Sequence, residues 1–363
     1  MKVLIASGGS GGHIFPAVSL ARELRVGGAE LIFVASRRRL DRNILEKEPY
    51  KKIFLSANPM PYKFGPRALV FPFKLALDGL SAFFILIKYR PEVVIGFGGY
   101  TSGALVLLGA MMKAKTLIHE QNVIPGRTNR FLDKIVEGVA VSFPETGKYF
   151  SNRNIVITGN PLRKESLEET RSGALGDFKL DRDRMTILVM GGSQGARSLN
   201  TLVSESMVLL SEARKGRLQV IHIAGARKTE EIQKRYDEEG IRGRVYAFIP
   251  NINEAYSVSD MAISRSGAAA VFELAAFRKP MILIPYPDEK NNQRFNAIYF
   301  AKKNAAIYRD EKTLRPEELR DLISDLIDNA NRRRGLSENA GKLSVIDGAK
   351  KLAEIVWAIK KST

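Results

Sequence analysis

The chain has 363 residues, of which 45% are hydrophobic and 26% charged, so it is long enough for two globular domains of about 150–200 residues. With no cysteine and only three histidines, its composition argues against a disulfide framework, a thiolate metal site and a multi-histidine metal centre. The formal net charge of +18 predicts an anionic partner: nucleic acid, an anionic membrane surface or phosphorylated substrates.

The first residues predict a strand and not a secretion signal. Residues 1–5 carry a positive charge but run straight into glycines, without the apolar stretch of about 7–15 residues of a signal peptide. Residues 93–112 contain no charged side chain over the length of a membrane-spanning helix, but several glycines interrupt them. We therefore expect a strand, a glycine loop and a helix in that segment.

Short apolar runs alternate with helical patterns, such as residues 17–26, along both halves of the chain. Buried parallel strands are predicted at residues 3–6, 31–34, 93–95, 116–118, 186–190, 220–223, 261–263 and 281–284. Strands that alternate with helices favour a doubly wound α/β fold.

The two halves also resemble each other. Residues 5–12 read Ile-Ala-Ser-Gly-Gly-Ser-Gly-Gly, and residues 188–195 read Leu-Val-Met-Gly-Gly-Ser-Gln-Gly. Turn-forming residues near 159–163 mark a boundary between the halves. The prediction is an N-terminal domain of residues 1–161 and a second domain of residues 162–340.

Four glycine loops precede predicted helices, at residues 8–12, 96–103, 191–195 and 266–267. Such a loop lets backbone N–H groups approach an anion, and the helix dipole favours negative charge there. In open α/β domains the ligand crevice lies at the carboxyl ends of the strands. We expect the loops to bind phosphate or diphosphate; ordinary tight turns are the alternative.

Two common nucleotide motifs are absent. The pattern G-x-G-x-x-G fails because Ile14 stands at the third glycine position, and residues 36–39 (Ser-Arg-Arg-Arg) offer no acidic residue for the ribose of NAD. Those arginines could contact the additional phosphate of NADP or form an exposed basic face. No Walker A pattern is present either. The chain is therefore expected to be neither a dehydrogenase nor a P-loop NTPase.

Several motifs, in order along nearly the whole chain, are similar to those of the MurG family. They lie at residues 8–13, 96–100, 119–122, 159–163, 191–197, 265–268 and 293–297. The family transfers N-acetylglucosamine from UDP-GlcNAc to the undecaprenyl-diphosphate-linked N-acetylmuramoyl-pentapeptide. The resemblance implies a GT-B fold, in which two Rossmann-like doubly wound domains face a central cleft. Residues 341–363, whose helical part has an apolar stripe, would be a C-terminal helix returning to the N-terminal domain.

The resemblance places UDP-GlcNAc chiefly on the C-terminal domain. Ile249 matches a uracil contact, and Glu273 matches the carboxylate that accepts from the ribose hydroxyls. The diphosphate and sugar contacts match Arg163, Ser193, Ser266, Gly267, Ala268, Asn292, Gln293 and Asn296. Asn292 departs from the family pattern, which has two glutamines at this point.

The acceptor diphosphate is assigned by resemblance to the N-terminal domain, at Gly98, Gly99 and Tyr100 and near residues 10–12. Ser10, Gly11 and Gly12 count among the donor contacts as well. Asn122 would contact the donor sugar or the acceptor hydroxyl.

The family's reaction inverts the sugar and needs a general base for the acceptor hydroxyl. His13 is the first candidate, because an unperturbed histidine pKa of about 6.5 suits that task and a helix N-terminus lowers it. Alternatively, His13 caps the helix or binds a phosphate. His119 and Glu120 are the reserve candidates, and His222, within an apolar strand, is interpreted as a core residue.

No metal or other cofactor is expected. Backbone amides, Ser193, Ser266 and Arg163 would stabilise the departing UDP. The segment Asp181-Arg182-Asp183 is interpreted as a solvated turn and not as a metal-binding motif.

The segment at residues 62–75 mixes large apolar side chains with cations, a pattern typical of a surface that binds anionic lipid. The predicted membrane contacts are Leu69, Phe71, Phe73 and Leu75. Pro72 predicts that no helix runs continuously through this segment, and residues 80–87 are interpreted as a core helix. We expect peripheral attachment to the cytoplasmic face of the plasma membrane.

Two alternative functions differ from this prediction. A related GT-B transferase that uses a UDP-sugar would act on a different acceptor. A nucleic-acid-binding protein would use the positive charge, but no recognition helix or aromatic RNA-binding motif is present, so no nucleic-acid partner is expected.

Overall fold

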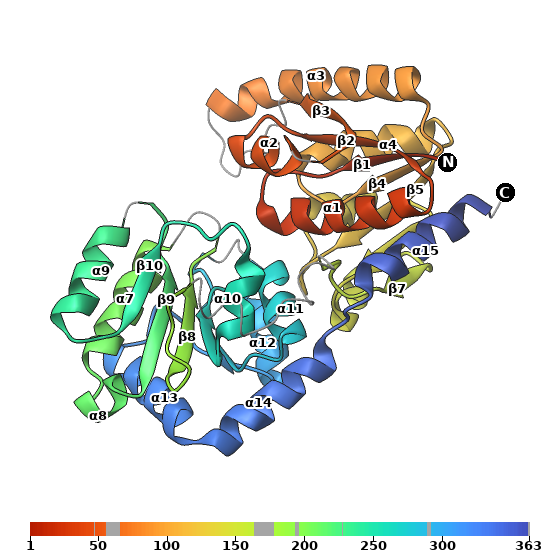
Figure 1. Cartoon of the computed structure of the whole chain (residues 1–363). Coiled ribbons are helices and arrows are strands. Elements are labelled where there is room, and N and C mark those ends of the chain that lie inside the picture. The colour runs from red at the N-terminus through yellow and green to blue at the C-terminus, as the bar shows by residue number, and fades with distance from the viewer. Residues whose placement is uncertain are drawn as a thin grey trace. The chain divides into compact units, whose positions relative to one another are not determined.

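The structure is a computed structural model that describes residues 1–46, 48–55, 66–162, 178–192, 196–226, 228–288 and 292–361. The side chains of residues 66–72 and 75 also lie outside the description. The chain forms two compact units (Figure 1). The N-terminal unit comprises Met1–Arg163 and Val345–Thr363, and the C-terminal unit comprises Lys164–Ser344.

The N-terminal unit contains a parallel sheet in the order β3-β2-β1-β4-β5-β6-β7. Its strands are β1 (Lys2–Ala6), β2 (Glu30–Ser36), β3 (Lys51–Leu55), β4 (Val93–Gly96), β5 (Lys115–Glu120), β6 (Gly138–Val141) and β7 (Ile155–Ile157). β1 and β4 are wholly apolar apart from Lys2 and Gly96, as expected of strands covered on both faces.

Helices cover both faces of this sheet, because successive side chains of a strand point to opposite sides. Val3 and Ile5 face α1 (Gly11–Val26), α2 (Arg39–Glu46) and α15 (Gly348–Lys361). Leu4 and Ala6 face α3 (Pro66–Tyr89), α4 (Tyr100–Met111) and α5 (Arg127–Leu132). In Figure 1, α3 and α1 accordingly lie on opposite sides of the strands. A short 3-10 helix, η1 (Pro144–Tyr149), precedes β7.

The last helix, α15, packs against α1 at the start of the chain. Its Leu352, Ala353 and Val356 are buried in the same core as α1. The ring of Trp357 lies so close to Gly27 that a Cβ atom there would be 3.0 Å away from it. The N-terminal unit is therefore built from both ends of the chain.

The interpretation of residues 66–89 needs two corrections. α3 is one helix from Pro66 to Tyr89 and continues past Pro72, although proline removes one backbone donor at a cost of about 3 kcal/mol. The loss affects one turn of a 24-residue helix that also contains eleven Leu, Ala, Lys and Arg residues, which are the stronger helix formers. Residues 80–87 are core only on one face: Ala82, Ile85 and Leu86 are buried, whereas other apolar side chains of this segment are exposed.

The C-terminal unit contains a second parallel sheet, in the order β10-β9-β8-β11-β12-β13. Its strands are β8 (Met185–Met190), β9 (Leu218–Ile223), β10 (Gly243–Tyr246), β11 (Met261–Ser264), β12 (Met281–Leu283) and β13 (Ile307–Tyr308). The helices are α7 (Arg197–Val208), α8 (Glu212–Lys215), α9 (Thr229–Glu238), α10 (Ile252–Val258), α11 (Ala268–Ala276), α12 (Gln293–Lys302), α13 (Pro316–Asp328) and α14 (Ala330–Leu343).

Two doubly wound parallel sheets confirm the predicted α/β class with two Rossmann-like domains. All eight predicted strands are present, and the strand order reverses between β1 and β4 and again between β8 and β11. In open α/β sheets, ligands bind outside the carboxyl ends of the strands at such a reversal. The topology thus selects one candidate ligand-binding edge on each unit.

Candidate functional site

The predicted glycine loops lie at these two edges. Residues 8–12 follow β1 and residues 97–99 follow β4, at the reversal in the N-terminal sheet. Gly191 and Gly192 follow β8, and residues 265–267 follow β11, at the reversal in the C-terminal sheet. Loops far apart in the sequence are therefore neighbours at the carboxyl ends of adjacent strands.

A buried carboxylate shapes the first loop. Asp41 Oδ2 accepts hydrogen bonds from the backbone N–H groups of Gly9 (2.8 Å) and Ser36 (3.2 Å) and from the Ser36 hydroxyl. Arg38 donates to the carbonyl of Gly9 at 2.7 Å. A Cβ atom on Gly8, whose φ is +149°, would lie 2.6 Å from Asp41 Oδ2. Sequence reasoning missed Asp41, because its contact with Gly9 spans 32 residues.

His13 lies in the first turn of α1, beside both N-terminal loops. Its Nδ1 is 3.1 Å from the Ser10 hydroxyl. A Cβ atom placed on Gly98 would lie 3.6 Å from His13 Nε2, and one on Gly99 would lie 3.7 Å from Nδ1. Surrounding protein lowers the pKa of His13 by desolvation, while Glu120, a hydrogen bond to the Gly8 carbonyl and Asp41 raise it in part. His13 is thus favoured in its neutral, basic form.

His119 has the surroundings of a structural residue. It is fully buried at the end of β5, and its ring centroid lies 5.2 Å from that of Phe97, with the two rings tilted by 37°. Its Nδ1 accepts from Gln121 Nε2 at 3.1 Å, and Nε2 lies 3.3 Å from the carbonyl of Gly159. Burial, offset in part by the Gly159 carbonyl, lowers the pKa of His119 to about 4.

Glu120 is buried, and both of its carboxylate oxygens accept hydrogen bonds. Oε1 accepts from the backbone N–H of Asn122 (3.0 Å) and from its side chain (3.2 Å). Oε2 accepts from the backbone N–H of Gly126 (3.0 Å) and from Asn129 Nδ2 (2.8 Å). The carboxylate therefore fixes the loop that carries Asn122, a predicted contact of the donor sugar or acceptor hydroxyl.

The second N-terminal loop is backbone that only glycine adopts easily. Gly98 and Gly99 have φ angles of +83° and +75°, in the left-handed region. Gly99 is the N-cap of α4, and Tyr100, its first residue, is 41% exposed. The loop brings backbone close to His13 and to Gly8, whose carbonyl oxygen would be 3.1 Å from a Cβ on Gly99.

In the C-terminal unit, hydrogen bonds connect the loops that follow β11 and β12. The buried Ser266 hydroxyl donates to the carbonyl of Gln293 at 2.8 Å, and Asn296 Nδ2 donates to the carbonyl of Ser266 at 3.1 Å. Gln293 Oε1 accepts from the backbone N–H of Tyr286 at 3.2 Å. Asn292 is the N-cap of α12, and Gly267 is the N-cap of α11, directly before Ala268. Most of the predicted diphosphate and sugar contacts thus form one connected group.

Glu273 and Ile249, the predicted contacts of the ribose and the uracil, lie on α11 and just before α10. Glu273, on α11, is 9% exposed, and its Oε2 accepts from the Tyr256 hydroxyl at 2.9 Å. Ile249 is buried in the loop between β10 and α10. Tyr256, on α10, therefore joins the element that follows Ile249 to the Glu273 carboxylate.

Arg265 is a buried cation that stabilises the loop containing Ser266. No role was assigned to it from the sequence. It is 4% exposed and forms a bidentate ion pair with Glu311 at 2.7 and 2.9 Å. It also donates to the carbonyls of Ile284 (3.1 Å) and Pro285 (2.9 Å) and to the Ser198 hydroxyl (3.2 Å). One guanidinium thus ties together the loops after β11 and β12 and the start of α7.

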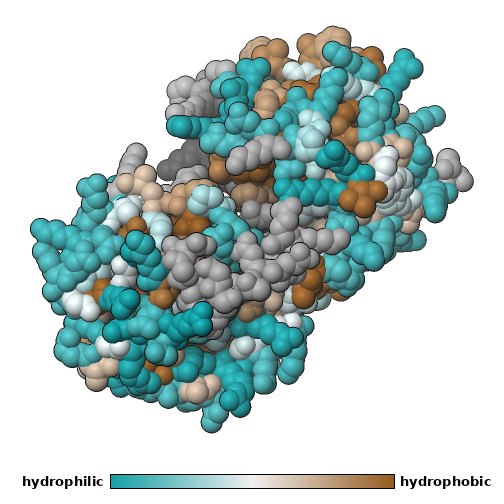
Figure 2. Space-filling model, in the orientation of Figure 1, coloured by the Kyte–Doolittle hydropathy of each residue, from teal (hydrophilic) through white to brown (hydrophobic). Residues whose placement is uncertain are grey.

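Arg163 and Ser193 lie outside the described residues, as do the side chains of Leu69, Phe71 and Leu75. Phe73 is described and is exposed on α3. It begins a stripe of apolar side chains, between 42% and 74% exposed, that continues through Leu77, Leu80, Phe84 and Ile87. Apolar residues gather over α3 in Figure 2 as well.

Two further predictions concern polar residues away from the loops. His222 is buried with both ring nitrogens hydrogen-bonded, to the Tyr236 hydroxyl (2.9 Å) and to Asn200 (3.2 Å), as expected of a core residue. Asp181 and Asp183 lie in a turn before β8, at the opposite end of that strand from Gly191.

Among the described residues, no group of three or more Asp, Glu or His side chains is placed to hold a metal ion. In the same part of the chain, no helix is both long and apolar enough to cross a membrane.

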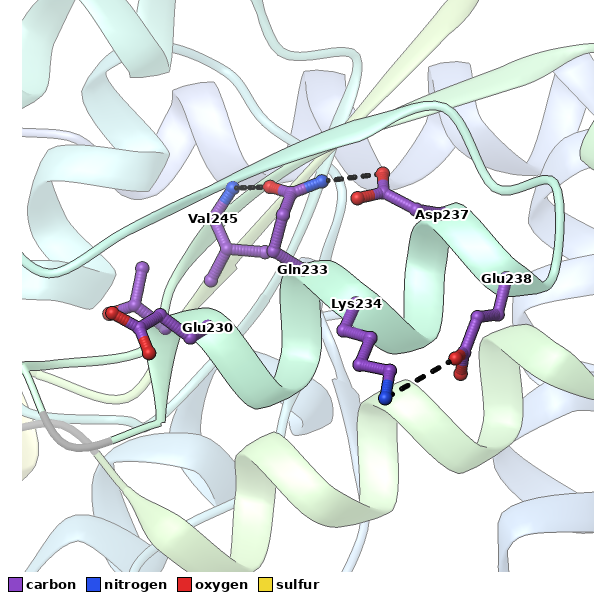
Figure 3. Close-up of a pocket in the computed structure, with 7 residues that line it drawn as sticks. Glu230, Gln233, Lys234, Asp237, Glu238 and Val245 are labelled. Atoms are coloured by element: carbon purple, nitrogen blue, oxygen red, sulfur yellow. Dashed lines mark hydrogen bonds and ion pairs between the residues drawn. The ribbon is translucent and has the colours of Figure 1, made fainter.

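Two hollows among the described residues, one on each unit, lie apart from the predicted residues. One, of about 430 Å³, lies along α9 and is lined by Gln233, Lys234, Asp237 and their neighbours. Figure 3 shows that these polar groups bond to one another, with Gln233 contacting Val245 and Asp237, and Lys234 pairing with Glu238. A second, of about 340 Å³, lies between α15 and the amino ends of β5 and β6. Neither hollow contains a predicted site residue.

Each half of the chain matches a family model of known proteins. Residues 3–141 match the glycosyltransferase family 28 N-terminal domain, and residues 186–353 match the glycosyltransferase family 28 C-terminal domain. A protein of Desulfotalea psychrophila, named UDP-N-acetylglucosamine--N-acetylmuramyl-(pentapeptide) pyrophosphoryl-undecaprenol N-acetylglucosamine transferase, is 34% identical over 98% of this chain and 95% of its own length.

Two other comparisons point the same way. A Geobacter sulfurreducens protein of the same name is 35% identical over 99% of this chain and its full length. The crystal structure of Acinetobacter baumannii MurG superposes with a TM-score of 0.79 and 25% identity, covering 98% of this chain and 99% of that one.

Proposed function

The chain belongs to the MurG family of glycosyltransferases, and from this premise we propose that it transfers N-acetylglucosamine from UDP-GlcNAc to the undecaprenyl-diphosphate-linked N-acetylmuramyl-pentapeptide in peptidoglycan synthesis. The observation that carries the proposal is the identity of 34–35% over nearly the whole length of relatives with this activity in their names. Each unit also has glycine loops at the carboxyl ends of its strands, where the strand order reverses. One such edge for UDP-GlcNAc and one for the lipid diphosphate would suit this reaction.

In the proposed reaction, His13 is the general base. Its lowered pKa favours the neutral ring, and with the proton on Nδ1, beside the Ser10 hydroxyl, Nε2 is free to accept a proton near neutral pH. The acceptor hydroxyl gives its proton to Nε2 while its oxygen bonds to the sugar carbon C1. The bond from C1 to the UDP oxygen breaks, and UDP departs with the electron pair. Glu120, with four donors on its oxygens, is better suited to holding the Asn122 loop than to taking the proton.

The donor is proposed to bind at the C-terminal edge. A carboxylate such as Glu273 accepts from two ribose hydroxyls, and the start of α11 at Ser266 and Gly267 offers backbone N–H groups to the diphosphate. Ile249 would contact the uracil. Asn292, Gln293 and Asn296, held beside Ser266, would contact the sugar. Arg163 and Ser193 remain predicted donor contacts, and no metal ion is proposed to take part.

Transfer to a lipid-linked acceptor tests this proposal. Purified protein is incubated with labelled UDP-GlcNAc and an acceptor that carries the N-acetylmuramyl-pentapeptide on an undecaprenyl or shorter diphosphate lipid. Labelled disaccharide on the lipid is the expected product. A folded sample that binds UDP-GlcNAc but transfers the label only to a different sugar acceptor would support the alternative GT-B activity instead.

The exposed apolar stripe of α3 supports a proposal of peripheral membrane attachment on the cytoplasmic face. Its members recur every three or four residues from Phe73 to Ile87, so they share one face of the helix. Exposed cations, among them Lys74, Lys88 and Arg90, flank it. Apolar side chains of an interfacial helix enter the lipid surface, and each nearby cation adds about 1 kcal/mol on anionic lipid.

Binding to liposomes tests the attachment. We expect Phe73→Ser combined with Leu77→Ser to weaken binding to vesicles that contain anionic lipid. Val26→Ser is the matched control, because Val26 is 88% exposed on α1, which covers the opposite face of the same sheet. Unchanged binding of the double variant would reject the α3 surface as the membrane contact.

A further inference from the structure

Asn129 is a buried residue of α5 that the proposed reaction has not used. Its Nδ2 donates to the carbonyl of His119 at 3.2 Å and to Glu120 Oε2 at 2.8 Å. Both partners can only accept, because a carbonyl and an ionised carboxylate have no proton to give. The orientation of the amide is therefore fixed, with the nitrogen toward β5 and the oxygen turned away from it.

The oxygen of this amide has an unmet capacity for hydrogen bonding. Asn129 is 1% exposed, and within the described part of the chain its Oδ1 has no hydrogen-bond partner. A buried polar atom without a partner is uncommon and destabilising, which suggests a partner that appears in another state of the protein.

Gly98 shows where this amide lies relative to His13. A Cβ atom on Gly98 would be 3.5 Å from Asn129 Nδ2, 3.8 Å from Asn129 Oδ1 and 3.6 Å from His13 Nε2. The amide and the imidazole thus border the same small space, which is open because residue 98 has no side chain. The other ring nitrogen, Nδ1, lies on the side of the Ser10 hydroxyl.

We propose that Asn129 is a positioning residue for His13: its Oδ1 accepts, directly or through one water molecule, the Nε2–H that His13 acquires when it takes the proton of the acceptor. This inference rests on the proposed function of His13 as the base. A base that accepts at Nε2 carries its resting proton on Nδ1, so in this tautomer neutral His13 has no Nε2–H to donate, in agreement with the unpartnered Oδ1. The Glu120 carboxylate, bonded to the other end of the amide, increases the negative potential at the protonated ring.

Other charged groups around His13 act alongside this pair. Glu120 and Asp41 raise the pKa of His13, and the positive charge of protonated His13 lowers the pKa of His119. Arg38, bonded to the Gly9 carbonyl, adds positive charge to the same loop. A test must therefore change Asn129 while leaving these four residues in place.

Titration of His13 by NMR is such a test and needs no substrate. The chain has three histidines, and burial lowers the pKa of His119 to about 4 and that of His222 to about 3, so His13 can be distinguished. In Asn129→Ala the imidazolium loses its acceptor, and we expect the pKa of His13 to fall by about one pH unit. In Asn129→Asp a negative charge replaces the amide, and we expect the pKa to rise by at least as much.

Asn152→Ala is the matched control. Asn152 also donates two hydrogen bonds from Nδ2 to backbone carbonyls of the N-terminal unit, those of Asp133 and Val136, at 2.8 Å each. We expect the His13 pKa of this variant to equal that of the wild type. Equal His13 pKa values in wild type, Asn129→Ala and Asn129→Asp would overturn the proposal; if Asn129→Ala does not fold, the direction of the shift in Asn129→Asp decides.

The pH profile of turnover separates positioning from a general loss of structure. We expect Asn129→Ala to lower kcat about tenfold and to move the acid limb of its pH profile down by about one pH unit. A lower kcat with an unmoved acid limb would assign Asn129 a structural role only. Failure of the wild type to transfer sugar would reject the proposed function. The NMR titration would still test the hydrogen bond between protonated His13 and Asn129, because it needs no substrate.

Discussion

The two units share a fold but differ in their surfaces. Each has a parallel sheet whose strand order reverses beside its first strand, and each carries glycine loops at that reversal. Yet the N-terminal unit has 27 Lys and Arg against 13 Asp and Glu, a net charge of +14, whereas the C-terminal unit has 30 against 26, a net charge of +4. The exposed apolar stripe of α3 also belongs to the N-terminal unit.

This difference separates what the fold supplies from what the surface supplies. Strand order and glycine loops are common to both units, and the proposed binding of a diphosphate by each unit depends on them. An excess of positive charge and an apolar helix face suit an acceptor at an anionic membrane, and only the N-terminal unit combines them among the described residues. We therefore expect substitutions in the N-terminal unit to affect the acceptor and the chemistry, and those in the C-terminal unit to affect the donor.

The largest effect is expected at His13. His13→Ala removes the proposed base, so kcat should fall about 10²- to 10⁴-fold, while the Kd for UDP-GlcNAc stays near that of the wild type. Transfer assays and calorimetric titration with UDP-GlcNAc measure the two quantities. A His13→Ala variant with near-normal turnover would reject His13 as the general base.

A smaller effect is expected at Glu273, in the C-terminal unit. Glu273→Gln keeps the shape but replaces the carboxylate proposed to accept from the ribose, so the Kd for UDP-GlcNAc should rise about tenfold or more. Tyr256→Phe removes the hydroxyl that bonds to Glu273 but keeps the carboxylate, and its Kd should change less. If both variants bind UDP-GlcNAc like the wild type, Glu273 is not a donor contact.

Each unit also contains one buried neutral histidine, and both should make the fold acid-sensitive. In the folded state burial lowers the pKa to about 4 for His119 and about 3 for His222, whereas the unfolded chain takes up a proton below about 6.5. The free energy of unfolding should therefore fall as the pH drops from 6.5, by about 2 kcal/mol per histidine at pH 5.

Urea unfolding at pH 7 and pH 5 measures this dependence. His222→Gln should reduce the loss of stability in the C-terminal unit and leave that of the N-terminal unit unchanged. If His222→Gln and the wild type lose the same free energy of unfolding between pH 7 and pH 5, groups other than His222 cause the acid sensitivity of the C-terminal unit.

The smallest effect is expected from removing metal ions. Leaving-group stabilisation is assigned to backbone N–H groups and polar side chains, so transfer should keep its rate after treatment with EDTA. An activity that is lost with EDTA and restored by Mg²⁺ or Mn²⁺ would contradict this prediction.

Much of the fold could be predicted because it depends on local patterns. Apolar runs predicted all eight expected strands, and glycines marked the loops that end them. The prediction that Pro72 interrupts the helix was wrong. It considered the backbone donor that proline lacks but not the stability of the surrounding turns of α3. Likewise, apolar composition alone did not show that residues 80–87 bury one face and expose the other.

The supporting contacts of the site were harder to predict, because they join residues that are distant in the sequence. Asp41 bonds to Gly9 across 32 residues, and Arg265 pairs with Glu311 across 46. Asn129 lies only nine residues from Glu120, but its importance depends on the direction of one amide group. A sequence motif identifies residue types, whereas these roles follow from which atoms have partners.

The return of α15 to the start of the chain has a consequence for synthesis on the ribosome. Residues 164–344 form an uninterrupted unit, so the C-terminal unit can complete its core as soon as it has emerged. The N-terminal unit is made first, yet it lacks Leu352, Ala353 and Val356 until the last helix is released. This side of its core therefore stays incomplete while the second unit is translated, and part of the apolar surface of α1 stays uncovered during that time.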